Sequence, residues 1–139
     1  MAPLITIEEF TEICSVAAPF IRVYGFETKE IGHGTSRVIM PAGESHIRPG
    51  GSISGPAQMA LADFALYAAV LGAIGPVPLA VTTNLSVNFL LKPLPGRLVG
   101  EARLMKLGKR LAVGEVNICS EGQNDPCCHV TGTYSIPPR

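Results

Sequence analysis

The sequence has few charged residues and no excess of either sign. It holds 11 lysines and arginines against 11 aspartates and glutamates, so 16% of its 139 residues are charged and the formal net charge is zero. Binding to a phosphate backbone needs a basic surface, so we expect no nucleic-acid partner. The hydrophobic share of 47% is high for a small chain, because small domains expose much of their surface. The length suits one domain over residues 1–139. The apolar excess needs further cover, so we expect a homodimer or a homotetramer.

The four cysteines lack the spacing of a metal site or of a disulfide framework. No pair has the C-x-x-C interval, and no histidine stands at a zinc-ligand interval. The adjacent Cys127 and Cys128 would point to opposite faces of an extended segment, so they are poorly placed to form a disulfide or to share a metal ion. We predict free thiols, no bound metal and a reducing, cytoplasmic location.

The chain also lacks the marks of a signal peptide and of a membrane span. Its first ten residues, MAPLITIEEF, contain no basic cluster and turn acidic at Glu8. Residues 64–81 are apolar enough for a membrane helix, but their helical part is interrupted at Gly72, Gly75, Pro76 and Pro78. We expect a core helix here and no membrane partner.

Two segments have the patterns of helices. Thr6 and Glu9 have the spacing of a capping box, and apolar residues then recur at helical intervals until Pro19. Gly55 and Pro56 begin a second run that is apolar on nearly every side and reaches about Gly72. A helix of this kind must be covered on every side. We therefore expect a sheet that curls around it or a second subunit that caps it.

The remaining segments have the patterns of strands. Residues 21–41 are rich in β-branched and aromatic residues around a Gly-His-Gly turn, which predicts two strands. The alternation over residues 82–89 predicts a strand with Thr82 and Asn84 on one face. Turns then separate three further strands that we expect to form a meander, over residues 97–107, 111–120 and 127–136. The sum is an α+β fold with an antiparallel sheet around one long helix.

Asp63 is the first candidate for a functional residue. It is the only formal charge between Arg48 and Lys92, and it lies in the middle of the apolar helix. Burying an ionised carboxylate costs on the order of several kcal/mol in lost hydration. A chain therefore keeps such a group only if it is paired with another group, neutralised or used in function. The structural alternative is a carboxylate that is hydrogen-bonded to the backbone, to Gln58 or to Tyr67.

Gly55 is the second candidate, because the first N–H groups of a helix have no internal acceptor and can hold an oxyanion. Glycine also lets a ligand approach the backbone closely. Asp63 lies eight residues further on, and the helical rise alone separates the two by roughly 12 Å. If Gly55 and Asp63 cooperate, they must come from different subunits.

The sequence around these residues resembles a known family. The stretch HIRPGGSISGPAQMALADFALYAA is similar to the signature of the PaaI-type acyl-CoA thioesterases, H-x-N-x-x-G-x-x-H-G-G followed by a helix with L-x-D. The segments TTNLSVNFLLKPLPGRL, EARLMKLGKRLAVGEV and HVTGTYS also look like that family's last strands. The resemblance implies a single hotdog-fold domain, in which a sheet wraps around a long central helix after a short N-terminal helix.

The resemblance also implies roles for three residues. Gly55 falls on the glycine whose N–H polarises the thioester carbonyl, and Asp63 on the acidic residue that acts as general base or nucleophile. Thr82 falls near a hydroxyl that helps to place the attacking water. The family assembles these groups across a dimer interface. The sequence does not decide between the base and the nucleophile.

Several polar positions depart from the family pattern. Arg48 stands where the family has asparagine, Ser54 where it has histidine, and Pro56 where it has a second glycine. The loss of that asparagine and histidine removes side chains that orient the thioester or water in the family. We expect substrate contacts from Arg48, Ser54, Gln58, Asn84, Lys109 and Arg110. Metals and redox cofactors have no part in the expected hydrolysis of acyl-CoA to free acid and CoA.

Two other functions stay open at this point. The lost histidine and asparagine would suit a non-catalytic acyl-CoA sensor or interaction module on the same fold, since fold does not fix function. A hydratase or dehydratase of enoyl thioesters usually needs an aspartate and a histidine close together. No Asp-x-x-x-x-His arrangement occurs near Asp63, so this activity ranks last.

Overall fold

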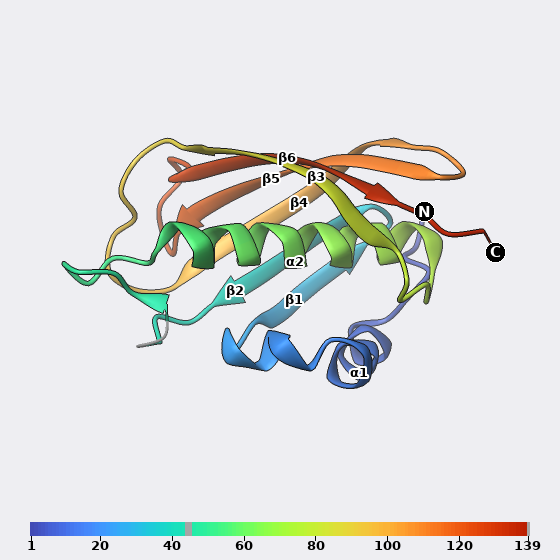
Figure 1. Ribbon diagram of the computed structural model, residues 1–139, viewed down its shortest axis with the longest axis horizontal. Helices are drawn as coiled ribbons and strands as arrows, with labels where there is room; N and C mark the ends of the chain where they lie inside the picture. Colours follow the sequence, from blue (N-terminus) through green and yellow to red (C-terminus); the bar gives the residue numbers. More distant parts are fainter. Residues whose placement is uncertain (44–45, 139) are drawn as a thin grey trace.

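A computed structural model of the protein describes residues 1–43 and 46–138. Within these residues the chain forms two α-helices, a short 3-10 helix and a six-stranded sheet (Figure 1). In chain order the elements are α1 (Ile7–Ala17), η1 (Pro19–Val23), β1 (Glu27–Gly32), β2 (Thr35–Met40), α2 (Gly55–Ile74), β3 (Val81–Phe89), β4 (Leu98–Leu107), β5 (Leu111–Ser120) and β6 (Cys128–Ser135).

The sheet is antiparallel throughout and has the strand order β1-β2-β4-β5-β6-β3. The predicted meander is confirmed for β4, β5 and β6, which pair as successive neighbours. β3 precedes them in the chain but crosses to the far edge and pairs with β6. α2 runs across one face of the curved sheet, and α1 lies beyond β1 (Figure 1). β1 and β3 are therefore the two edges.

The N-terminal helix begins as its sequence predicts. Thr6 caps α1 by accepting from the Glu9 N–H at 3.1 Å, while the Glu9 carboxylate accepts from the Thr6 N–H at 3.0 Å. The expected strand from residue 21 is wrong, because residues 19–23 form η1 and the first strand starts only at Glu27. Proline at the start of η1 fixes a turn-compatible φ, which favours the 3-10 turn over an extended chain.

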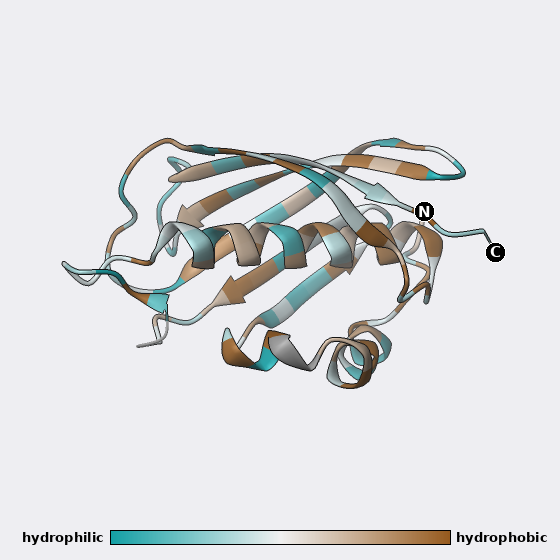
Figure 2. Cartoon of the chain, in the orientation of Figure 1, coloured by the Kyte–Doolittle hydropathy of each residue, from teal (hydrophilic) through white to brown (hydrophobic). Residues whose placement is uncertain are grey.

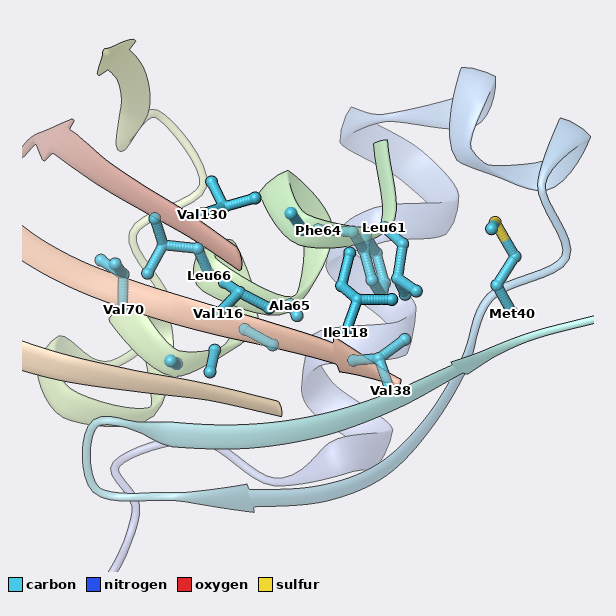
Figure 3. Packing of buried hydrophobic residues seen from close by; sticks show 14 of the residues in the cluster. Val38, Met40, Leu61, Phe64, Ala65, Leu66, Val70, Val116, Ile118 and Val130 are labelled. Carbon is cyan, nitrogen blue, oxygen red and sulfur yellow. The ribbon is translucent and has the colours of Figure 1, made fainter. Parts of the chain in front are cut away.

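α2 is the core of the molecule. Thirteen of its 20 residues are buried, and Figure 3 shows side chains from α2 packed among those of β2, β5 and β6. The helix is long and apolar enough to cross a membrane, with a mean hydropathy of 1.6, but 72% of that stretch is buried inside the fold. That burial is what a core helix of a folded domain shows. The sheet supplies the cover that its sequence requires.

Glycines let the sheet approach this helix closely. A Cβ at Gly132 would lie 2.7 Å from the Leu66 side chain, and a Cβ at Gly72 would lie 2.2 Å from the Gly32 carbonyl oxygen. Real Cβ atoms do not come so near, so side chains at these positions would push the two layers apart. This close packing determines which side of α2 stays partly exposed.

A bulge in β3 changes which residues face the helix. The pairing with β6 shifts between Thr82 and Asn84, so that Thr82 lies opposite Tyr134 and Asn84 lies opposite Thr133. Thr82 therefore faces α2, whereas Asn84 lies on the outer face. The prediction that Thr82 and Asn84 share a face is wrong, because Thr83 is an extra residue in the ladder and breaks the alternation.

Candidate active site

The Asp63 carboxylate is half-buried on α2 and accepts two hydrogen bonds on the same oxygen. The Thr82 hydroxyl donates to Oδ1 at 2.6 Å from β3, and the Tyr134 hydroxyl donates to Oδ1 at 2.7 Å from β6. Both are short contacts to an acceptor that carries charge when ionised, a strong class of hydrogen bond. Two strands and the central helix thus meet at one carboxylate oxygen.

Tyr134 was not among the residues that the sequence singled out. Its side chain is only 3% exposed, and it stacks on Tyr67 with ring centroids 6.0 Å apart. Burial, and then the negative charge of Asp63, raise the pKa of the Tyr134 phenol well above its usual range. Tyr134 therefore stays protonated and acts as a donor to the carboxylate.

The structural partners considered for Asp63 from the sequence are engaged elsewhere. The Gln58 amide is buried and donates to the Ile53 carbonyl at 3.2 Å. The Tyr67 hydroxyl donates to the Pro78 carbonyl at 3.0 Å, and burial raises the pKa of Tyr67 to about 12. Gln58 thus supports the loop before α2, and Tyr67 ties α2 to the turn that follows it.

The N-terminus of α2 has one free backbone donor. Pro56 has no N–H, the Ala57 N–H donates to the Ser54 hydroxyl at 3.3 Å, and the Gln58 N–H donates to the Ser54 carbonyl at 3.1 Å. Among residues 1–43 and 46–138, the Gly55 N–H has no acceptor. It stands at the positive end of a 20-residue helix, where an oxyanion is favoured.

The Ser54 hydroxyl, expected to contact substrate, is used as the helix cap. The Phe89 ring covers Gly55, because a Cβ at Gly55 would lie 3.3 Å from the tip of that ring. Phe89 is itself 54% exposed. The free N–H of Gly55 thus lies beside an aromatic ring at the end of the edge strand β3.

A tight turn leads into this helix. The Arg48 N–H donates to the Ser52 carbonyl at 2.9 Å, and the Gly51 N–H donates to the Arg48 carbonyl at 3.0 Å. The Arg48 side chain is exposed. His46 is 3% exposed, and its Nε2 lies 2.6 Å from the Tyr24 carbonyl. This histidine holds the base of the turn, and its ring contacts Tyr24 rather than the carboxylate.

The structure brings together some of the candidate residues and separates others. Asp63 and Thr82 are in direct contact, whereas Gly55 is eight residues, or roughly 12 Å, away along one straight helix. Lys109 and Arg110 are exposed at the tip of the β4–β5 turn, which is hydrophilic in Figure 2. This tip lies at the sheet end where β3 begins, because Leu111 pairs with Ser135 and Ser135 pairs with Val81.

Three cavities in the described part of the chain have linings that do not include Asp63. One, of about 540 Å³, opens on the outer sheet face between Arg37 and the β5–β6 turn. Another, of about 170 Å³, is apolar and lies between α1 and α2, walled by Phe10, Phe26 and Phe64. Within the described residues no three His, Cys, Asp or Glu side chains gather as a metal site would require.

Comparison with known proteins identifies the family. Residues 50–127 match the Thioesterase superfamily. A provisionally assigned thioesterase from Silicibacter sp. TM1040 is 41% identical, with a TM-score of 0.89 over 99% of this chain and 96% of that one. A variant of the phenylacetic acid degradation protein PaaI from Thermus thermophilus is 26% identical, with a TM-score of 0.75 over 86% of this chain and 99% of that one.

A curated relative points the same way. A provisionally assigned esterase from Saccharolobus solfataricus is 28% identical over 134 residues, which are 96% of this chain and 87% of the relative. These likenesses support the hydrolysis of acyl thioesters in general terms. The expected hotdog fold and the PaaI-type resemblance are both confirmed. The chain belongs to the thioesterase superfamily and has its hotdog fold.

Proposed function

We propose that the protein hydrolyses acyl-CoA thioesters to free acid and CoA at a site shared by two subunits. One observation carries the proposal: α2 holds a free oxyanion donor at Gly55 and an anchored carboxylate at Asp63. One helix cannot bring the two to a single carbonyl, since about 12 Å of helical rise separates them. A second copy of the chain can supply the missing half to each.

The free edge of β3 offers a way to pair the two copies. Antiparallel pairing of β3 with itself about its middle residue, Leu85, would set Thr82 opposite the partner's Asn88 and Val81 opposite the partner's Phe89. Phe89 lies over Gly55 in each chain. The partner's Gly55 would then approach Asp63, which already contacts Thr82.

Exposed apolar side chains follow the same surface. Met59 on α2 is 40% exposed, Phe89 at the end of β3 is 54% exposed, and Leu90 just after it is 55% exposed. Exposed large apolar side chains favour association, and an unpaired edge strand is a site where it occurs. A dimer through β3 and α2 would cover both.

The chemistry follows from the two halves. The Gly55 N–H of one subunit would donate to the thioester oxygen as negative charge develops there. In one route the partner's Asp63 takes a proton from water as the water oxygen bonds to the carbonyl carbon. The C–S bond then breaks and the sulfur leaves protonated. In the other route the carboxylate attacks directly and water hydrolyses the mixed anhydride.

Basic side chains at both ends of the sheet suit the phosphates of CoA. Arg48 is exposed in the turn before α2, and the Lys92 ammonium would lie 3.8 Å from a Cβ at Gly50 in that turn. Lys109 and Arg110 lie near the start of β3. Antiparallel pairing of β3 brings the start of one strand beside the end of the other, so the two basic groups would flank one site.

The test is thiol release from a panel of aromatic and aliphatic acyl-CoAs. We expect turnover with at least one member and its loss in Asp63→Asn, which keeps the shape and removes the charge. Asp125→Asn is the matched control, because Asp125 is exposed in the β5–β6 turn and should leave kcat unchanged. Wild-type rates in Asp63→Asn would remove Asp63 from the mechanism.

A non-catalytic acyl-CoA sensor is the second candidate. Its support is that Ser54 replaces the histidine of the family motif and is committed to capping α2. A non-hydrolysable thioether analogue of acyl-CoA, measured by calorimetry, separates the two functions. Tight binding without any thiol release across the panel would favour the sensor, whereas catalytic release of thiol would exclude it.

A further inference from the structure

The two oxygens of the Asp63 carboxylate are not equivalent. Oδ1 accepts from the Thr82 and Tyr134 hydroxyls at 2.6 and 2.7 Å. Oδ2 accepts from no side chain in residues 1–43 and 46–138, and it is not among the buried unpartnered atoms of that part of the chain. Oδ2 therefore faces the open side of α2, on which the neighbouring Met59 and Ala60 are also accessible.

The two donors form one structural unit. Thr82 and Tyr134 are directly paired residues of β3 and β6, and the bulge at Thr83 is what turns Thr82 toward the helix. The Tyr134 hydroxyl also lies 3.0 Å from the Asp63 main-chain carbonyl. Its single proton goes to the shorter contact with the carboxylate oxygen, because a charged acceptor makes the stronger bond. The Asp63 carboxylate is thereby held from β6 by a buried ring and from β3 by Thr82.

We propose that Thr82 and Tyr134 are positioning residues that fix Oδ1, so that Oδ2 is the oxygen that reacts with water or thioester. The inference rests on the proposed thioesterase function. A carboxylate with one fixed oxygen has its plane and its free lone pairs set before substrate arrives. Thr82 then acts through Asp63, rather than by placing the water itself as the resemblance implied.

The proton balance of the base route is simple under this assignment. Oδ2 accepts one proton from water while the water oxygen bonds to the carbonyl carbon. The same proton then passes to the sulfur as the C–S bond breaks, and Asp63 ends ionised as it began. In the nucleophilic route Oδ2 forms the bond to carbon and the thiolate leaves. In both routes Oδ1 keeps its two donors throughout.

The experiment compares Tyr134→Phe with Tyr67→Phe. Both remove one phenolic hydroxyl from stacked rings, but the Tyr67 hydroxyl bonds the Pro78 carbonyl and not Asp63. We expect Tyr134→Phe to lower kcat about tenfold or more, with KM within about twofold of the wild type, since a hydrogen bond to a charged group is involved. Tyr67→Phe should leave both constants unchanged.

A second pair of variants distinguishes the loss of a hydroxyl from a defect in folding. Thr82→Val removes the hydroxyl and should lower kcat, whereas Thr82→Ser keeps it and should restore most of the rate. The 13C shift of the Asp63 carboxyl carbon, compared between variants at one fixed pH, gives a readout that needs no turnover. It should change in Tyr134→Phe, which removes a hydrogen bond to this carboxylate, and stay as in the wild type in Tyr67→Phe.

The outcomes separate this inference from the function on which it rests. No thiol release by the wild type on any acyl-CoA would remove the proposed function, while the carbon shift would still report on the hydrogen bonds. An active wild type whose Tyr134→Phe variant matches it in kcat and in the Asp63 carbon shift would overturn the inference alone. Equal losses in Tyr134→Phe and Tyr67→Phe would also overturn it, because they would indicate a packing effect.

Discussion

The two functional regions of α2 differ in what each has and lacks. At its N-terminus the Gly55 N–H has no acceptor within the described residues, and the turn before it offers the Arg48 side chain but no carboxylate. Two turns further on, Asp63 has a carboxylate with one oxygen fixed by Thr82 and Tyr134. It has no backbone donor aimed at a substrate oxygen, because the N–H groups of a helix interior are paired.

The difference is the reason for the proposal that one chain does not contain a complete site. Attack on a thioester needs a stabilised oxyanion and a carboxylate at the same carbonyl. A single straight helix holds these groups apart by a fixed rise, and no side-chain movement closes a gap of roughly 12 Å. In the proposed dimer, pairing of two β3 edges would bring the start of one helix to the middle of the other, so that each region would complete its counterpart.

The largest expected effect comes from deleting the donor at the helix start. Gly55→Pro removes the N–H and fits the first helical position, since Ser54 already has the extended backbone that precedes proline, with φ −68° and ψ 156°. We expect kcat to fall about 100- to 1,000-fold, as for the loss of an oxyanion donor. Thiol-release kinetics measure this change.

Gly55→Ala is the matched control for the added carbon. It also adds a Cβ beside the tip of the Phe89 ring, at 3.3 Å, but keeps the N–H. It should retain far more activity than Gly55→Pro. Similar losses in both variants would show that crowding near Phe89, rather than the donor, sets the rate.

The next expected effect comes from weakening the proposed dimer without changing Gly55 or Asp63. Met59 is 40% exposed on α2 in the single chain, so a charge there costs little unless a partner buries it. We expect Met59→Glu to shift light-scattering mass from twice the chain mass toward 14.6 kDa, and to remove most of the activity. A fully active monomer would contradict the shared site.

A smaller effect, on stability rather than chemistry, is expected at the other end of α2. Gly72→Ala places a Cβ 2.2 Å from the Gly32 carbonyl oxygen, and overpacking of this kind costs about 1 to 3 kcal/mol of unfolding free energy. Gly108→Ala, where the nearest atom is 3.5 Å away, is the control. Urea unfolding should show the loss in the first variant only.

The last expected effect concerns the buried thiols and is confined to alkaline pH. Burial raises the pKa of Cys14, Cys127 and Cys128 from 9.0 to about 11 in each case. Between these values the folded protein binds more protons than the unfolded chain, so stability is fully present below pH 9 and declines as pH rises toward 11. Denaturant unfolding at about pH 8 and about pH 10.5 measures this decline. A flat profile would contradict it.

Much of the fold could be predicted because its signals are local. The capping box at Thr6 and Glu9 and the bounds of β5 are as the sequence indicates. The crossing of β3 to the far edge could not be predicted in this way, because its partner β6 begins at Cys128, far along the chain from the end of β3 at Phe89. The 3-10 turn at residues 19–23 was missed because its apolar residues also suit a strand.

The site shows the same limit. Gly55 and Asp63 could be proposed because glycine at a helix start and a charge in an apolar helix are visible in the sequence itself. Tyr134 was not found, because only the register of β3 with β6 places it opposite Thr82. The bulge at Thr83 likewise moves Asn84 to the outer face and is invisible in an alternating pattern. Pairings between distant strands carry this information.

The most direct test of the shared site is complementation between two inactive variants. Gly55→Pro and Asp63→Asn chains would be mixed in equal amounts, unfolded and refolded together, and assayed for thiol release. In a symmetric dimer half of the products are heterodimers with one intact site, so activity should return to about a quarter of the wild-type value. If each site lies within one chain, the mixture will stay as inactive as its components, and the account is wrong.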